Sequence, residues 1–398
     1  MPGPAAFSVA NLSAAVSNGS VPQSLVDDKV RRVLLSMFKA GMMVPGYNPV
    51  AYTADRNSPA MQALALQAAR ESLVLAKNNG NLLPLNKATT QKIAIIGLYA
   101  TDCRNDGGGS GSLTGPYCIS ITQGVTSKIA GTATTLVSDW TTADTVFVVV
   151  GINDPGEGFD RTNVDLPVVN GVDQNALVAQ VLAAKPNRTV VVYTGGSAAI
   201  AGSWSNAPAI IMALYPGQEQ GNALAEVIFG DYNPGGRLSI SFPNTADQLP
   251  PWGPSFNTYE SAGEGRGYYY YDKHNLTPLF AFGHGLSYTS FAYSNLRITG
   301  MTVQVDVKNT GTRAGDEVVQ LYISDPVASV DRRVKDLRGF QRVNIAAGAT
   351  ATVTFTLTDQ DLAYWRDSTN SWYVEPGVFN VLIGASSRDI RLQGSITK

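Results

Sequence analysis

Short apolar runs alternate with helical stretches through the middle of the chain, and this alternation is the strongest constraint on its fold. Runs this rich in Val and Ile are typical of strands that are buried on both faces of a sheet. A helix between successive strands returns the chain for parallel pairing. The pattern predicts an α/β domain, with a mostly parallel sheet flanked by helices, over residues 91–243. The runs lie at 93–96, 145–150, 190–193 and 209–214, and the helical stretches include 174–184 and 219–229.

The segment before this domain, residues 1–90, is helical in pattern. One helix is predicted to carry its apolar residues on one face and to stop at Gly41, because glycine adopts the backbone conformation that ends helices. A second is predicted to begin at Ser58-Pro59 and to run through residue 76. A chain that opens in Met-Pro-Gly-Pro with no preceding strand indicates a piece of a larger domain. The apolar face of the first helix comprises Val26, Val30, Val33, Leu34, Met37 and Phe38.

The pattern changes again after the α/β domain. Residues 244–295 are rich in Pro, Gly and Tyr and are interpreted as an ordered connector rather than a flexible linker. Residues 296–398 alternate apolar and polar side chains in short runs separated by turns such as Asn309-Thr310-Gly311. Strands at this spacing predict an all-β sandwich.

Composition excludes several classes of function. The chain has 398 residues, 44% of them hydrophobic and 15% charged, which is typical of packed globular domains. A formal net charge of −2 argues against a nucleic-acid partner, and no apolar stretch is long enough to cross a membrane. No secretory signal is readable, so the compartment is left open. Cys103 and Cys118 are either one short-range disulfide or two free thiols.

An ordered series of motifs resembles glycoside hydrolase family 3 from the first residue to nearly the last. The resemblance implies the end of a (β/α)8 barrel over 1–90, the family's C-terminal α/β sandwich domain over 91–243, and a fibronectin type III-like domain, an immunoglobulin-like sandwich, over 296–398. The motifs are Lys-Asn-Asn-Gly at 77–80, Gly-Gly-Gly-Ser-Gly-Ser at 107–112, Tyr-Pro-Gly-Gln-Glu at 215–219, Asn-Pro-Gly-Gly-Arg-Leu at 233–238, Phe-Gly-His-Gly-Leu-Ser-Tyr-Thr at 282–289 and Leu-Arg-Gly-Phe at 337–340.

The catalytic candidate lies in Gly-Glu-Gly-Phe-Asp-Arg at 156–161, directly after an apolar run. In family members with such a loop its Glu is the general acid/base, which implies that role for Glu157. A carboxyl on a glycine-flanked loop beyond the carboxyl end of a strand can be lowered onto a substrate, where loss of water raises its pKa. Asp160 and Arg161 are interpreted as a pair that supports the loop, and Asp154 is the alternative acid. The alternative, non-catalytic interpretation of Glu157 is a solvent-exposed acid on a loop, paired with Arg161.

The second carboxyl that a glycosidase needs is not identified in this sequence. The family's nucleophile is an Asp in a Ser-Asp-Trp motif on a barrel strand, and Ser138-Asp139-Trp140 matches those letters. This match falls just before an apolar run inside the α/β domain, whereas the family's motif belongs to the barrel upstream. Asp139 is therefore predicted to cap or turn an element boundary.

Other candidate sites are given structural interpretations. The glycine run at 107–111 lacks the Lys-Ser/Thr that would complete a phosphate loop, which argues against a nucleotide-binding fold. His284 is predicted to be buried and hydrogen-bonded, and two His with two Cys far apart predict no metal site and no cofactor. Some aromatic residues could stack on sugar, but they are predicted to pack in the core or at an interface, as such residues more often do. They are Trp204, Trp252 and the tyrosines at 268–271.

Two hypotheses of function follow. In the first, the chain is the acid/base half of a β-glucosidase-like retaining exo-glycosidase, which hydrolyses O-glycosyl bonds of β-glucosides or oligosaccharides and needs a catalytic barrel as partner. The parent enzyme would then be extracellular, and the isolated chain inactive. In the second, it is a non-catalytic module that binds carbohydrate or protein. Loss of the barrel would expose apolar surface on residues 1–90, so self-association favours the first hypothesis and a clean glycan-binding monomer the second.

Overall fold

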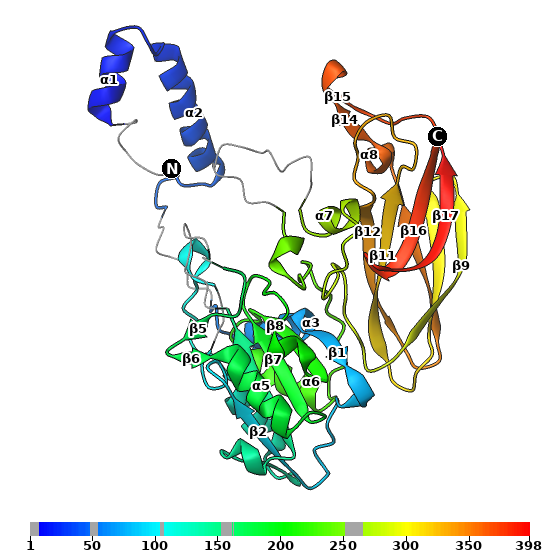
Figure 1. Cartoon of the computed structure of the whole chain (residues 1–398). Helices are drawn as coiled ribbons and strands as arrows, with labels where there is room; N and C mark the ends of the chain where they lie inside the picture. The colour runs from blue at the N-terminus through cyan, green and yellow to red at the C-terminus, as the bar shows by residue number, and fades with distance from the viewer. Residues whose placement is uncertain (1–7, 48–54, 104–106, 153–160, 162, 251–265) are drawn as a thin grey trace. The chain divides into compact units, whose positions relative to one another are not determined.

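The computed structural model describes residues 8–47, 55–103, 107–152, 161, 163–250 and 266–398 (Figure 1). The chain divides into two compact units, Met1–Ser58 and Pro59–Lys398. No helix in the described part of the chain is long and apolar enough to cross a membrane.

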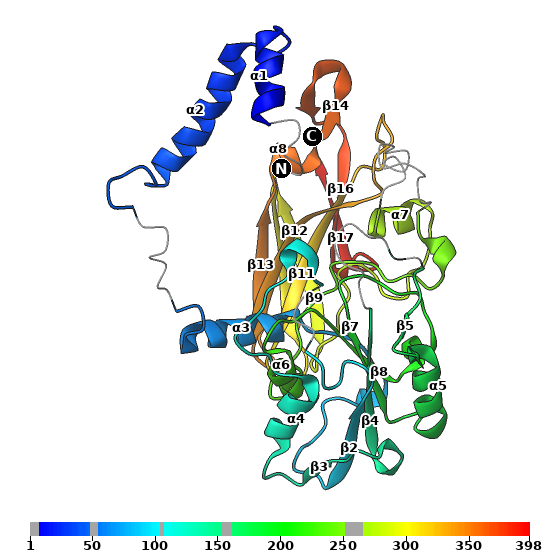
Figure 2. The ribbon, with the colours of Figure 1, turned by 90° about the vertical axis from the view of Figure 1, so that its left-hand side faces the viewer.

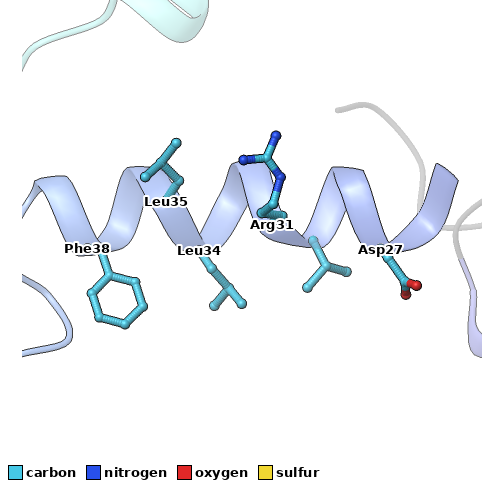
Figure 3. A pocket seen from close by; sticks show the side chains of 6 residues that line it. Asp27, Arg31, Leu34, Leu35 and Phe38 are labelled. Atoms are coloured by element: carbon cyan, nitrogen blue, oxygen red, sulfur yellow. The ribbon is translucent and has the colours of Figure 1, made fainter. Parts of the chain in front are cut away.

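The first unit consists of helices α1 (Val9–Ser17) and α2 (Gln23–Lys39). Gly41, two residues beyond α2, has a φ of +70°, so glycine stops this helix as the sequence predicts. The apolar side chains of α2 are exposed: Val30 is 50% and Phe38 61% accessible. Figure 3 shows Leu34 and Phe38 projecting from one side of α2 and Leu35 from the other.

The second unit begins with a six-stranded sheet in the order β1-β8-β7-β4-β2-β3. Every neighbouring pair in this sheet is parallel except β1 with β8. The mostly parallel sheet that the sequence predicts is therefore confirmed, with one antiparallel edge. The strands are β1 (Val74–Asn78), β2 (Gln91–Ile96), β3 (Thr134–Leu136), β4 (Thr145–Gly151), β7 (Thr189–Thr194) and β8 (Ala209–Leu214).

Helices cover both faces of this sheet, as Figure 2 shows. Alternate residues of β4 point to opposite faces: Phe147 packs with helices α3, α4 and α6, and Val148 packs with α5. Every residue of β4 is buried, which explains its uninterrupted apolar sequence. The helices are α3 (Pro59–Ser72), α4 (Ile121–Ile129), α5 (Gln174–Ala184) and α6 (Gln220–Ile228).

One predicted helix boundary is wrong. The helix expected to continue through residue 76 ends at Ser72, and residues 74–78 form strand β1. Leu73, Val74 and Leu75 are all buried, and β1 pairs with β8 from Val74–Met212 to Asn78–Ala209. An apolar stretch of this length suits a helix or a strand equally, and pairing with the distant β8 decides between them.

The C-terminal part is the predicted antiparallel sandwich. A three-stranded sheet, β13-β10-β9, and a four-stranded sheet, β12-β11-β16-β17, enclose one apolar core. The strands are β9 (Phe291–Thr299), β10 (Thr302–Asn309), β11 (Gly315–Ser324), β12 (Asp336–Ile345), β13 (Thr350–Thr356), β16 (Val378–Ser386) and β17 (Asp389–Thr397).

Several smaller elements complete the chain. Helix α7 (Tyr268–Lys273) lies in the connector, and helix α8 (Asp359–Leu362) precedes the hairpin of β14 (Tyr364–Arg366) and β15 (Ser371–Tyr373). A second short hairpin pairs β5 (Val168–Val169) with β6 (Val172–Asp173). The 3-10 helices are η1 (Asn79–Asn81), η2 (Gly109–Gly111), η3 (Trp140–Thr142), η4 (Ser203–Asn206), η5 (Ala246–Gln248) and η6 (Asp367–Thr369).

A buried ion pair joins the α/β domain to the sandwich. The Arg237 guanidinium lies 3.0 Å from the Glu317 carboxylate, and their side chains are only 8% and 4% exposed. Tyr293 donates a hydrogen bond to Glu317 at 2.8 Å. Charges buried this deeply are stable only when paired, so the two domains depend on each other at this contact.

Candidate functional site

The loops that follow β2, β4 and β8 leave the sheet at the carboxyl ends of its parallel strands. Ligands in open α/β sheets bind at this edge, because the loops there diverge and leave accessible backbone and side-chain groups. The glycine-rich segment follows β2, the Gly-Glu-Gly segment follows β4, and the 215–219 turn follows β8. The loops that carry these motifs in the sequence therefore all start at one edge of the sheet.

The loop after β4 carries the predicted acid/base. Glu157, its support Asp160 and the alternative acid Asp154 lie outside the described residues. Arg161 is described, and it holds the far end of this loop: its guanidinium donates to the carbonyls of Ala198 and Asp165, each at 2.8 Å. Arg161 also donates to the Ser197 hydroxyl at 3.2 Å. These contacts fit a supporting role for Arg161, through the segment that follows β7.

Gln174 fastens both ends of the same loop. Its amide oxygen accepts from the Gly151 N–H, and its amide nitrogen donates to the carbonyls of Gly151 and Pro167, all at 2.8 Å. Gln174 is only 2% exposed, so water does not compete with these bonds. The local sequence pattern marks Gln174 only as the start of a helical stretch, because it cannot predict bonds to residues 23 and 7 positions away.

We expect Gln174→Glu to lower the free energy of unfolding by about 2 kcal/mol, because a carboxylate cannot donate to the two carbonyls that Gln174 serves. Urea unfolding followed by circular dichroism measures the change. The matched control is Gln393→Glu on β17, where Gln393 is exposed and a change of under about 0.5 kcal/mol is expected. Equal stability of Gln174→Glu and the wild type would contradict the role given to this amide.

The loop after β2 is held against the start of α6. Cys103 and Cys118 form a disulfide that closes the loop, which settles the alternatives left open by the sequence. The Ile119 N–H donates to the Gln218 carbonyl at 2.8 Å, and Tyr117 donates to the Glu219 carboxylate. Glu219 is 6% exposed and also accepts from Asn222 at 2.6 Å. This loop and the 215–219 turn therefore form one connected structure.

The glycines of this loop allow close packing. A Cβ on Gly107 would lie 3.1 Å from the Tyr215 ring, and one on Gly115 would lie 3.0 Å from the Gln218 side chain. Gly108 has a φ of +83°, which side chains disfavour. The glycine-rich loop therefore lies against the turn after β8.

Asp139 occupies the other end of β4. Its carboxylate accepts from the Thr141 N–H at 3.0 Å and caps the 3-10 helix η3, which is the boundary role predicted for it. Strand β4 separates Asp139 from the loop of Glu157, and its seven residues extend roughly 20 Å. Carboxyls that act together in a retaining glycosidase lie only about 5–5.5 Å apart. The fold therefore argues against Asp139 as the partner of Glu157.

The remaining candidates have structural contacts. Trp204 is fully buried beside Phe242 and Tyr193, and three of the four tyrosines at 268–271 are buried. Tyr268 accepts a hydrogen bond from the Leu337 N–H at 2.9 Å and so contacts the sandwich. Trp252 lies outside the described residues. Among the residues that are described, no group of three His, Cys, Asp or Glu could hold a metal ion.

His284 is hydrogen-bonded, as predicted, but it is only half-buried. Its Nε2 lies 2.8 Å from the Ala76 carbonyl oxygen and donates to it in the neutral ring, while the ring stacks on Phe280. Burial lowers the pKa of His284, and the bond to Ala76 opposes this shift. The imidazole therefore links the connector to strand β1 in its neutral form.

This lowered pKa predicts a loss of stability in mild acid. Below about pH 6.5 the unfolded chain protonates His284 before the folded chain does, so the free energy of unfolding falls as the pH drops toward the folded pKa. His284→Gln keeps a donor for Ala76 but cannot titrate. Urea midpoints at about pH 7.5 and pH 5.5 should fall more in the wild type than in His284→Gln. An equal fall in both proteins would contradict the assignment.

Comparisons with known proteins agree with the division into an α/β domain and a β sandwich. Residues 73–288 match the family model of the glycosyl hydrolase family 3 C-terminal domain, and residues 317–387 match that of the fibronectin type III-like domain. The chain is 34% identical to Thermostable beta-glucosidase B of Acetivibrio thermocellus, covering 96% of this chain and 53% of that protein. It is 35% identical to Probable beta-glucosidase L of Neosartorya fischeri, covering 97% of this chain and 60% of that protein.

A solved structure of a similar protein has the same fold over nearly the whole of this chain. The crystal structure of beta-D-glucoside glucohydrolase from Trichoderma reesei superposes with a TM-score of 0.85 at 31% identity. The alignment covers 99% of this chain and 62% of that chain. The chain therefore spans between about half and three-fifths of the length of these relatives.

Proposed function

The chain belongs to glycoside hydrolase family 3, and from this premise we propose that it is the acid/base half of a retaining β-glucosidase. The observation that carries the proposal is the loop after β4: Glu157 lies in it by sequence, and its described ends, at the carboxyl-end edge of the parallel strands, are held by Gln174 and Arg161. In this proposal the substrate is a β-glucoside or oligosaccharide, and the enzyme releases its terminal sugar.

Glu157 acts twice in the proposed reaction. Its protonated carboxyl first donates a proton to the glycosidic oxygen while a carboxylate nucleophile attacks the anomeric carbon, and the aglycone leaves as an alcohol. The Glu157 carboxylate then takes a proton from water, which attacks the anomeric carbon and releases the sugar with its configuration retained. Flanking glycines let the loop approach the sugar closely, and exclusion of water there keeps the carboxyl protonated before attack.

The nucleophile is proposed to come from a barrel domain outside these 398 residues. Asp139 is at the wrong end of β4, and the relatives extend well beyond the part that this chain matches. We also propose that the first unit, residues 1–58, belongs to that barrel and its linker, whereas the rest of the predicted 1–90 segment contributes α3 and β1 to the α/β domain. The exposed apolar face of α2 supports this, since Val30, Val33 and Phe38 are each at least half accessible and suit burial against another domain.

Turnover of an aryl β-glucoside tests this proposal. We expect residues 1–398 alone to show no turnover, and activity to appear when a family 3 barrel domain is added as a separate chain. The control is the barrel domain by itself, which should also be inactive because it lacks the general acid. Full turnover by residues 1–398 alone would contradict the proposed division of the two carboxyls.

A further inference from the structure

Two exposed tryptophans share one face of the β14–β15 hairpin. Trp365 and Trp372 are directly paired across its strands, with ring centroids 5.6 Å apart and planes at 79°. They are 44% and 56% exposed, although tryptophan is normally among the more buried residues. Figures 1 and 2 show this hairpin at the end of the sandwich where β17 finishes.

The opposite face of the hairpin is what holds it to the sandwich. Tyr364 and Tyr373 are paired there, with the Arg366 guanidinium over the Tyr373 ring. Arg332 lies over Tyr364, at 5.6 Å from its centroid, and forms a buried ion pair with Asp325 at 3.0 Å. Packing on this face accounts for the position of the hairpin. It does not explain why Trp365 and Trp372 are exposed on the other face.

We propose that Trp365 and Trp372 form a binding platform for the pyranose rings of a β-linked glucan. The two indoles together expose about 200 Å², since a whole aromatic side chain covers roughly 150–250 Å². A stable protein interface needs about 800 Å² on each partner, so this patch is too small for a protein but is the size of one or two sugar rings.

The chemistry of the patch also fits this ligand. The face of an indole ring carries negative charge, whereas the face of a pyranose presents C–H groups with partial positive charge. In β-glucopyranose every hydroxyl is equatorial, so both faces of the ring are free to stack. The turn of the hairpin adds exposed hydrogen-bonding groups at Asp367 and Thr369, which can bind the ring hydroxyls.

Binding at this hairpin requires no hydrolysis, so it is measured on residues 1–398 as they stand. Affinity electrophoresis in soluble mixed-linkage β-glucan and titration with cellohexaose, followed by tryptophan fluorescence, provide two readouts. We expect the glucan to retard the wild type and Trp365→Ala and Trp372→Ala each to weaken binding about tenfold. The control Phe340→Ala removes an aromatic side chain that is 68% exposed on β12, and it should bind as the wild type does.

Two results would overturn the proposal: no retardation of the wild type, or unchanged retardation of the double alanine variant. Thermal unfolding shows whether the variants are folded. If an alanine variant unfolds early, Trp365→Phe and Trp372→Phe replace it, because they keep a ring in the hairpin. Their smaller rings should weaken glucan binding several-fold, and unchanged affinity would count against the platform.

Discussion

Replacing Glu157 by Gln in the protein completed with a barrel domain is expected to lower kcat for an aryl β-glucoside by about 10²- to 10⁴-fold. The amide is close in shape to the acid but has no acidic proton for the leaving oxygen. The loss in kcat/KM, which reports the step that expels the leaving group, should be largest for alkyl or sugar leaving groups and smallest for a dinitrophenyl glucoside, whose leaving group departs without protonation. Steady-state rates over a series of leaving groups measure this dependence.

Asp154→Asn is the matched control, because Asp154 is the alternative acid in the same loop. It should retain most of the activity and show the same leaving-group dependence as the wild type.

Azide should rescue Glu157→Ala and give the β-glucosyl azide, since a small anion can replace the water that Glu157 activates. The acid/base role would pass to Asp154 if Asp154→Asn, and not Glu157→Gln, caused the loss.

Arg237→Met is expected to destabilise the second unit by about 3–5 kcal/mol, because it leaves the Glu317 charge buried without its partner. Glu317 is 4% exposed at the contact between the α/β domain and the sandwich. Urea unfolding of the wild type and the variant measures the difference. The double variant Arg237→Met/Glu317→Leu removes both charges and should recover most of the loss, whereas a double variant as unstable as the single one would show that the charge is not the cause.

The same variant should become sensitive to pH. Burial raises the pKa of Glu317 above its usual value, and the Arg237 charge opposes this shift. Without Arg237 the folded chain binds this proton more readily than the unfolded chain, so stability falls as the pH rises through the interval between the two pKa values. The deficit of Arg237→Met relative to the wild type should therefore be smaller at about pH 5 than at about pH 8.

Much of the fold could be predicted from the sequence because its strands have distinctive patterns. Residues 145–150 are almost all apolar, and they form a strand that is buried on both faces. Val303, Val305 and Val307 alternate with polar residues, and they point into the sandwich core. Such patterns are local, and each needs only one or two neighbouring strands to be satisfied.

The features that local sequence patterns do not reveal depend on distant partners. Residues 74–78 form a strand only because β8, more than 130 residues later, offers an edge for pairing. Gln174 was counted as part of a helix, while its amide holds Gly151 and Pro167. The hairpin tryptophans were not singled out, because exposure cannot be read from residue type. Glu157 was identified through the family's motif, and its acid/base role stays a proposal.

The most direct test of the account is to find which chain becomes labelled by a mechanism-based glycoside. The completed enzyme, assembled from residues 1–398 and a separate barrel chain, is treated with a 2-deoxy-2-fluoro-β-glucoside, which traps the glycosyl group on the nucleophile. Intact mass spectrometry then weighs both chains. The account predicts one added fluoroglucosyl group on the barrel chain and none on residues 1–398. A label on residues 1–398, at Asp139 or elsewhere, would contradict it.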